Sequence, residues 1–221
     1  MIANQIFNYM QHKKLHFDRN PEHVNIIYVE GVNEDMQPNG DRIDFWNDRR
    51  LVIQCDKWGQ PQILLNVACT TEPGLAATNS AAARKRGGVA RVQFGQFTAW
   101  RVGFHQQTRL GTSHPALVQV MPLNVHRDAN QDGIRPGDKL APAWGINQHG
   151  TRLGLNPARV GMWSEGCLVG RDWPDHIKFM ELVQTDARYK KSKTHIFTTT
   201  IINGTEMYQF TQSQKHPPTV L

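Results

Sequence analysis

The chain has 221 residues, of which 39% are hydrophobic and 20% are charged, which is enough apolar material for one sizeable core. Lys and Arg number 25 against 19 Asp and Glu, and the net charge of +6 favours a polyanionic partner. No apolar run reaches the roughly 18 residues that a membrane-spanning helix needs, so we expect no membrane span.

The N-terminal segment has helical periodicity. Between residues 2 and 13 apolar side chains recur at helical spacing and predict a short amphipathic helix, through Ile2, Ile6, Phe7 and Met10. This helix either packs on the main domain or serves as a docking peptide. We divide the chain into a helical segment at 1–20, a main domain at 21–210 and a tail at 211–221.

Strand-like apolar runs dominate the rest of the chain. Turn residues such as Pro38-Asn39-Gly40 and Pro73-Gly74 separate these runs. The predicted strands cover residues 24–29, 50–55, 63–69, 90–94, 116–125 and 195–202. The pattern predicts a mostly β domain, either a sandwich or a barrel, with a few short helices.

Two segments between these strands have other compositions. Residues 76–88 are rich in alanine, serine and basic side chains, and we interpret them as a mobile loop. Residues 174–185 form the best predicted helix after the N-terminal one, because Pro174 suits a first turn, where its missing N–H has no partner.

The three cysteines do not form the even-numbered framework of a small disulfide-rich domain. Cys55 and Cys69 could pair if they lie on adjacent strands, but buried free thiols are the favoured interpretation. Cys167 is different, because it ends the turn Trp163-Ser164-Glu165-Gly166-Cys167 and follows the histidine of His149-Gly150 after a spacer. A thiol becomes a useful nucleophile when an imidazole takes its proton.

This constellation predicts acyl transfer. Cys167 would attack a peptide carbonyl, His149 would act as base and then as acid, and the N–H groups of Gly166 and Cys167 would hold the oxyanion. Ser164 would bond the loop or orient the substrate, and Asn147 would position the strand of the histidine. The alternative is a buried small cysteine and an unrelated loop histidine, but their spacing within a glycine turn favours catalysis.

Several further side chains are candidate substrate contacts. His105 and Arg127 each follow an apolar run, and Trp163 lines the cleft by virtue of its neighbours. Glu165 would oppose thiolate formation if it faced the sulfur, so we expect it to face solvent or a substrate amine.

The acidic run that begins at Asp128 offers two interpretations. Asp128, Asn130 and Asp132 stand at alternating positions before Gly133, as oxygen ligands do in a calcium loop. A polar turn is the favoured interpretation, because these residue types are also turn formers and the glutamate that should close a calcium loop is absent. No cofactor is otherwise required, and calcium is the one metal ion that the sequence suggests.

The His149 to Cys167 segment resembles the L,D-transpeptidase (YkuD-type) catalytic domains, whose signature is His, a spacer, then Ser or Thr, His, Gly and Cys. Here Glu165 stands where the family has its second histidine, and Leu168-Val169-Gly170 replaces the polar or basic residues that follow. A closer resemblance covers residues 23–202 and is to an uncharacterised branch of phage and bacterial lysin-like proteins. It rests on these segments: 70–74, 95–97, 100–105, 116–120, 127–130, 145–149 and 163–167.

The resemblance implies a YkuD-like fold and a peptidoglycan-degrading cysteine enzyme, a lysin-type peptidase or carboxypeptidase on stem peptides. A glycan-cleaving, muramidase-like lysin that uses carboxylates such as Glu165 is one alternative. A non-catalytic wall-binding or virion structural module is another. Peptidoglycan is therefore the expected partner, ahead of nucleic acid, for which no binding motif is present.

The N-terminal residues lack the charged-then-apolar pattern of a secretion signal, because polar side chains interrupt residues 1–14. We therefore expect a protein made in the cytoplasm that acts on the cell wall or in the periplasm after release by lysis or delivery within a particle.

Overall fold

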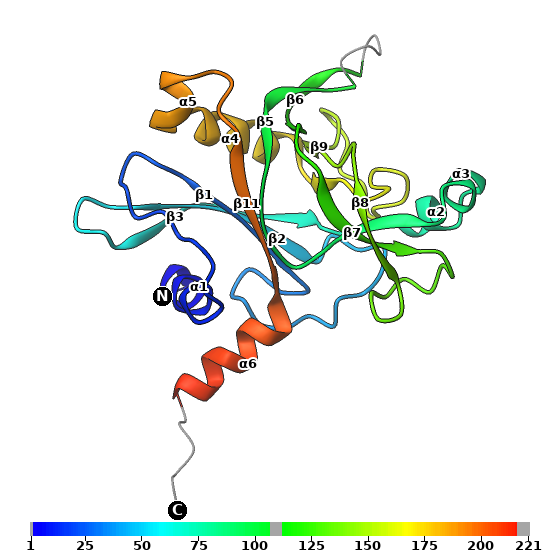
Figure 1. Cartoon of the computed structure of the whole chain (residues 1–221), viewed down its shortest axis with the longest axis horizontal. Helices are drawn as coiled ribbons and strands as arrows, with labels where there is room; N and C mark the ends of the chain where they lie inside the picture. The colour runs from blue at the N-terminus through cyan, green and yellow to red at the C-terminus, as the bar shows by residue number, and fades with distance from the viewer. Residues whose placement is uncertain (1, 107–111, 216–221) are drawn as a thin grey trace, which may run out of the picture.

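The computed structural model describes residues 2–106 and 112–215, and its main body is a closed β-barrel (Figure 1). The strand order around the barrel is β1-β11-β5-β6-β9-β10-β3-β2. The strands are β1 (Asn25–Glu30), β2 (Asp48–Cys55), β3 (Pro61–Thr70), β5 (Gly95–His105), β6 (His114–Gln119), β9 (Gln148–Gly150), β10 (Leu168–Gly170) and β11 (Phe197–Asn203). The pairs β1–β11 and β9–β10 are parallel and the others antiparallel. The prediction of a mostly β fold is confirmed.

A second, three-stranded antiparallel sheet lies beside the barrel, on the right of Figure 1. Its strands are β4 (Val89–Val92), β7 (Leu123–Asp128) and β8 (Lys139–Ala143). The prediction of a single strand at residues 116–125 is therefore wrong. This segment contains parts of two strands, because the chain leaves the barrel after β6 and enters the second sheet as β7. Pro122 lies at the break and has no N–H to continue a ladder.

The barrel is covered by apolar contacts on both of its faces. Every residue of β1 is buried, and alternate side chains pack into two different cores. Ile26 and Tyr28 join the interior core with Trp100, whereas Ile27 and Val29 join an outer core under the N-terminal helix. This is why residues 26–29 of β1 form a continuous apolar run rather than an alternating pattern.

Helices close the barrel at its ends and sides. The predicted first helix is α1 (Ile2–His12), which packs on the outer core through Ile6 and Met10. The helix predicted at 174–185 is α4 (Trp173–Gln184), followed by α5 (Ala187–Lys191). Among the described residues, no helix has the length and apolar character that a bilayer crossing requires.

Two predicted irregular segments contain helix instead. The segment expected to be a mobile loop at residues 76–88 contains α2 (Leu75–Thr78) and α3 (Ala81–Lys85). Alanine is the strongest helix former, and the Ser80 side chain caps α3 by accepting the Ala83 N–H.

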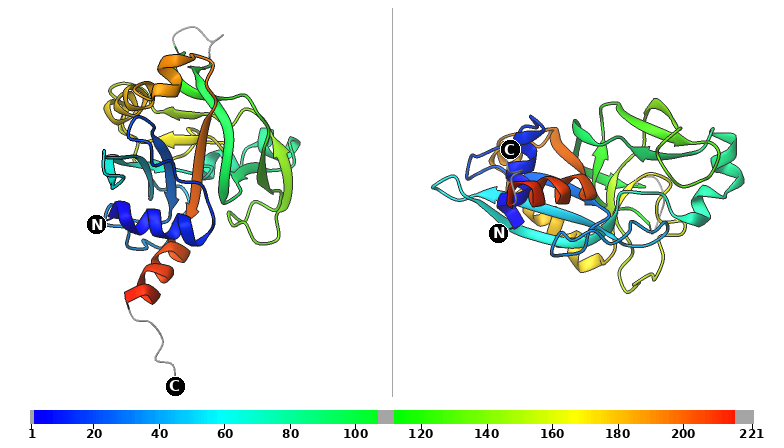
Figure 2. Two further views of the ribbon diagram at one scale, coloured as in Figure 1. Left: turned by 60° about the vertical axis from the view of Figure 1, so that its left-hand side comes forward. Right: turned by 90° about the horizontal axis from the view of Figure 1, so that it is seen from below.

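The predicted tail at 211–221 also begins inside a helix. α6 (Gly204–Lys215) projects from the barrel next to α1, as Figure 2 shows. The Phe210 ring packs against Tyr9 and stacks on His12 of α1, which explains why this polar segment is ordered. The remainder of the predicted tail, residues 216–221, lies outside the described residues.

Candidate active site

The parallel neighbours β9 and β10 position the two residues of the predicted catalytic pair, with His149 in β9 and Cys167 directly before β10. His149 lies opposite Val169 in the register, and the N–H of Leu168 donates to the Asn147 carbonyl at 2.9 Å. Cys167 directly precedes β10 and therefore lies beside Asn147. The pairing of these two three-residue strands thus brings His149 and Cys167 close together, although 17 residues separate them in the sequence.

Both residues line a single pocket of about 430 Å³. The barrel contributes one wall of this pocket, and the three-stranded sheet contributes another through Ala90 of β4 and Arg127 of β7. The pocket gathers six of the predicted site residues, which are His105, Arg127, His149, Trp163, Glu165 and Cys167. Asn147, Ser164 and Gly166 are not among the lining residues, but Asn147 bonds His105 and Cys167, and Ser164 bonds Cys167.

The sulfur of Cys167 has polar neighbours from the loop before β9. It accepts the N–H of Asn147 at 3.4 Å and lies 3.5 Å from the Gly145 carbonyl oxygen. The residue is half-buried, and the loss of water around the sulfur raises the pKa of the thiol to about 11, with the Glu165 carboxylate adding to the rise. Cys167 is therefore a protonated thiol at neutral pH.

The imidazole of His149 is buried and held in one tautomer. Its Nδ1 lies 2.9 Å from the Gly150 carbonyl oxygen, and because a carbonyl can only accept, Nδ1 carries the proton. Nε2 keeps a free lone pair. Burial lowers the pKa of His149 well below its ordinary value, and the adjacent His105 lowers it further. His149 is thus a neutral acceptor.

His105 lies against His149 as a second imidazole. The two rings stack with centroids 4.0 Å apart and planes 12° apart. The Asn147 amide donates to Nδ1 of His105 at 3.0 Å, and its oxygen accepts the Gln119 N–H at 3.0 Å, which fixes the amide orientation. Burial lowers the pKa of His105 to about 4. The sequence suggested a substrate contact here, and in the structure His105 lines the pocket and stacks on His149.

The turn before the cysteine is built around Ser164 and Gly166. The Ser164 hydroxyl donates to the Cys167 carbonyl at 2.8 Å and accepts the Gly166 N–H at 3.1 Å. Gly166 has a φ of 139°, and a Cβ at this position would lie 2.6 Å from the Ala90 carbonyl oxygen. The turn therefore requires glycine for its backbone conformation and for its close approach to β4.

Of the two N–H groups predicted to hold the oxyanion, those of Gly166 and Cys167, the prediction is wrong for Gly166. The Gly166 N–H is already bonded to Ser164, so it is not free for a substrate oxygen. The Cys167 N–H remains, because no acceptor for it is present among the residues that the structure describes. Of the two predicted donors, only the Cys167 N–H is therefore left without a partner in the described part of the chain.

An ion pair that the sequence did not predict lies at the edge of the pocket. Arg86, at the C-terminus of α3, donates to the Glu165 carboxylate at 2.5 Å, and both side chains are about half exposed. Glu165 is exposed, as expected, and has a positive partner in Arg86. The basic cluster containing Arg86 gave no sign of this contact, because the pairing depends on how α3 packs.

A buried arginine braces the two site strands from the barrel interior. Arg50 of β2 donates from Nη2 to the carbonyls of His149 and Leu168, both at 3.0 Å, and its Nη1 lies 3.2 Å from Nδ1 of His176. Its guanidinium also lies over the Phe179 ring. Little in the sequence signals this role, because Arg50 follows Asp48 and Arg49 in the charged first part of β2.

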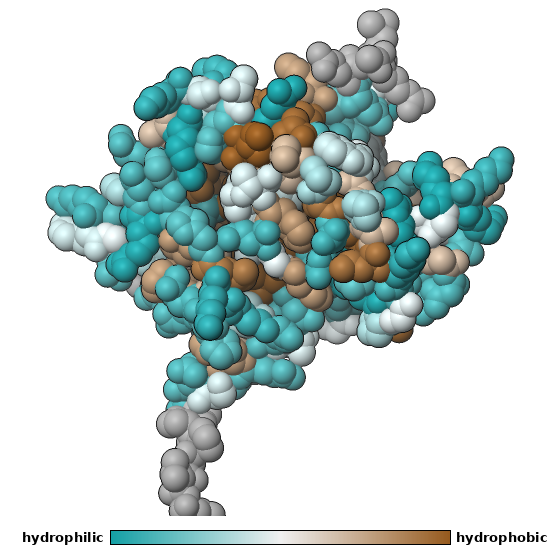
Figure 3. Space-filling model, viewed as in Figure 1, coloured by the Kyte–Doolittle hydropathy of each residue, from teal (hydrophilic) through white to brown (hydrophobic). Residues whose placement is uncertain are grey.

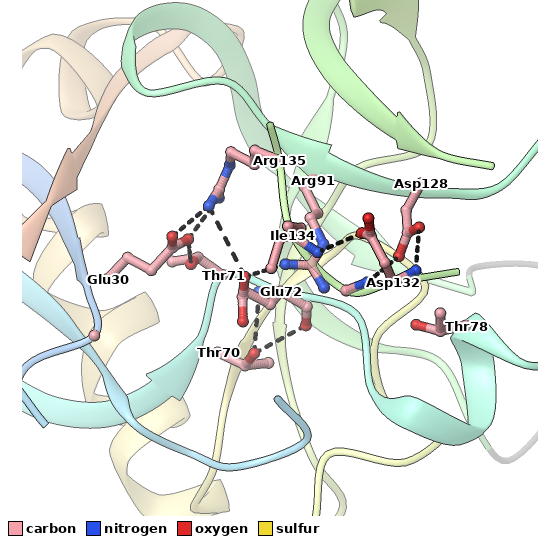
Figure 4. Close-up of polar contacts among 12 residues, drawn as sticks. Glu30, Thr70, Thr71, Glu72, Thr78, Arg91, Asp128, Asp132, Ile134 and Arg135 are labelled. Carbon is pink, nitrogen blue, oxygen red and sulfur yellow. Dashed lines mark hydrogen bonds and ion pairs between the residues drawn. The ribbon is translucent and has the colours of Figure 1, made fainter. Parts of the chain in front are cut away.

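The acidic run at Asp128 folds as a polar turn. The two oxygens of Asp128 accept the N–H groups of Asp132 and Gly133 at 3.1 Å, and Asp132 accepts from Ile134 at 2.9 Å (Figure 4). These bonds occupy the carboxylates that were candidate calcium ligands, together with Asn130, which bonds Asp132. The turn interpretation is the one that the contacts support.

A different acidic group converges elsewhere. Within residues 2–106 and 112–215, the one set of three ligand-type side chains with closely spaced atoms is Glu30, Asp41 and Glu72. Figure 4 shows Glu30 and Glu72 paired with Arg135 and Arg91. The two arginines therefore already bond carboxyl oxygens that would ligate a metal ion.

Comparison with protein-family models, with curated proteins and with solved structures finds no match for this chain.

Proposed function

We propose that this protein is a YkuD-type cysteine enzyme that hydrolyses stem peptides of peptidoglycan. The observation that carries the proposal is the placement of Cys167 and the Nε2-bearing ring of His149 in one pocket, with the Nδ1 of that ring bonded to the Gly150 carbonyl. This arrangement supports the role of base that the YkuD resemblance assigns to His149.

Catalysis starts from a neutral thiol and a neutral imidazole. The sulfur of Cys167 attacks the peptide carbonyl carbon as its proton passes to Nε2 of His149, and the new oxyanion accepts the Cys167 N–H. The imidazolium then gives this proton to the leaving amine, and the C–N bond breaks to leave a thioester. Water, deprotonated by His149, cleaves the thioester and restores the thiol.

The second imidazole fits this cycle. His149 becomes positively charged only after it takes the proton, and the flat neutral ring of His105 then lies 4.0 Å from it. A charged His105 would oppose this step by like-charge repulsion, whereas a neutral ring adds no positive charge beside the imidazolium. The lowered pKa of His105, to about 4, keeps that ring neutral at physiological pH.

The glycan-cleaving alternative has less support. A muramidase-type mechanism needs two carboxyl groups, one of them protonated. Glu165 is the only carboxylate among the residues that line the pocket, so the second carboxyl group that this mechanism needs is missing from the lining. The peptidase mechanism requires neither condition.

The test uses purified sacculi and mass spectrometry of the released fragments. Wild-type protein should release fragments with new amino termini, and Cys167→Ala should release none. Cys55→Ala is the matched control, because Cys55 is a free thiol buried in the outer core. New reducing sugar ends, or full release by Cys167→Ala, would contradict the proposal.

A further inference from the structure

A second pocket of about 430 Å³ lies on the other side of the loop that connects β9 to β10. Its walls come from residues 32–49 and from Ala158 and Arg171. Three arginines line it, Arg42, Arg49 and Arg171, and Glu34 is the only acidic lining residue. The sequence scatters these arginines over about 130 positions, so the charge becomes concentrated only on folding.

A fourth arginine joins this cluster through an aromatic ring. The guanidinium of Arg42 lies 4.2 Å from the centroid of Phe45, and that of Arg159 lies 3.6 Å from the same centroid. In the part of the chain that the structure describes, neither Arg42, Arg159 nor Arg171 forms an ion pair with an acidic side chain. Like charges gathered without counter-charge repel one another, and an anion between them removes that repulsion.

The walls of the pocket are fixed to each other by hydrogen bonds. Trp46 donates from its indole N–H to the Pro157 carbonyl at 2.7 Å, and the Asp44 carboxylate accepts the Gly161 N–H at 2.7 Å. The Asp44 carbonyl also accepts the Val160 N–H at 3.1 Å. The arginines therefore stand on a preformed frame, which lowers the ordering cost of binding.

We propose that this pocket binds the phosphate groups of a phosphodiester polymer that carries no nucleobases. Guanidinium groups match phosphate oxygens in geometry and remain charged at every physiological pH. Single-stranded nucleic acid would need an exposed aromatic face for base stacking, but the Phe45 ring has two guanidiniums over it. The site goes beyond the proposed peptidase activity and does not depend on it.

The second pocket and the pocket of Cys167 share the loop between β9 and β10. The β9–β10 loop contributes Ala158 to the lining of the second pocket and Arg159 to the arginine cluster. The same loop contributes Met162 and Trp163 to the pocket of Cys167. A polymer held by the arginines would therefore lie next to the catalytic cleft. Phosphate polymers of a cell wall would in this way concentrate the enzyme beside its peptide substrate.

The experiment measures binding of four probes at fixed ionic strength: inorganic phosphate, a poly(glycerol phosphate) oligomer, a single-stranded oligonucleotide of equal charge, and polyglutamate of equal charge. The variants are Arg42→Gln, Arg159→Gln and Arg171→Gln. Arg101→Gln is the matched control, since it removes the same charge from an exposed position on β5 outside the pocket.

Each pocket variant should weaken poly(glycerol phosphate) binding by about tenfold and reduce its salt dependence, while Arg101→Gln changes the affinity less than about twofold. Inorganic phosphate should bind weakly at the same site, and cleavage of a small soluble muropeptide should stay unchanged in Arg42→Gln. Equal losses in all four variants would overturn the proposal, because binding would then follow net charge alone. Oligonucleotide or polyglutamate binding that is as tight and as sensitive to these variants would overturn it too.

Discussion

The protonation state of the proposed catalytic pair can be tested through alkylation of Cys167 as a function of pH. Burial raises the pKa of this thiol from 9.0 to about 11. At pH 7 the thiolate fraction is then about one in ten thousand, compared with about one in a hundred for a thiol with a pKa near 9. Iodoacetamide, which reacts with the thiolate, should therefore modify Cys167 about a hundredfold more slowly than an unperturbed thiol.

The assay follows the modification of Cys167 by peptide mapping from pH 6 to pH 10.5, with circular dichroism to confirm that the fold persists. The rate should rise about tenfold for each pH unit and begin to level off only near pH 11. Cys55 and Cys69 are buried and serve as internal references for unfolding. His149→Ala should leave this profile nearly unchanged while abolishing turnover, because His149 is uncharged before substrate binds.

A rate plateau between pH 5 and pH 8 would refute this reasoning. Such a plateau would mean that Cys167 and His149 form a thiolate–imidazolium pair before substrate binds. It would also require that polar contacts outweigh the effect of burial, which raises the pKa of Cys167 and lowers the pKa of His149.

Three further predictions concern stability and can be measured by denaturant unfolding. Gly166→Ala should cost about 1–3 kcal/mol, because its Cβ would collide with the Ala90 carbonyl in a left-handed backbone region; an unchanged midpoint would contradict the turn geometry. Arg50→Met should cost about 2–4 kcal/mol through loss of the buried bonds that brace the site strands, and a stabilised variant would contradict that role. Burial and the nearby Glu30 raise the pKa of Glu72 to about 9, so the folded chain keeps a proton that the unfolded chain has released, and stability should fall from pH 7 to pH 9. Glu72→Gln should flatten that slope, and a slope that persists unchanged would show that another group is responsible.

Local sequence patterns predict the parts of this fold whose cause is local. The apolar periodicity of α1, the Pro174 signal of α4 and the continuous apolar run of β1 each reflect burial of that element alone. The short helix α3 carried a readable signal as well, because Ser80 before three alanines is a cap followed by strong helix formers.

The features that the sequence hides arise from pairing between distant segments. β9 and β10 have only three residues each, too few for any periodicity, and their parallel pairing is what places Cys167 near His149. The contact of Arg86 with Glu165 depends in the same way on tertiary packing. The arginine cluster over Phe45 is a further example. Figure 3 shows a mainly hydrophilic face with small apolar patches. The position of a charged residue in the sequence does not indicate which side chains lie next to it on such a face.

The most direct test of the central proposal is the mass of the intact protein after brief incubation with a purified muropeptide and an acid quench. The account predicts an adduct on Cys167 equal to the muropeptide minus its leaving amine, absent in Cys167→Ala and in His149→Ala. Wall fragments released by wild-type protein with no thioester adduct, and released equally by Cys167→Ala, would contradict it.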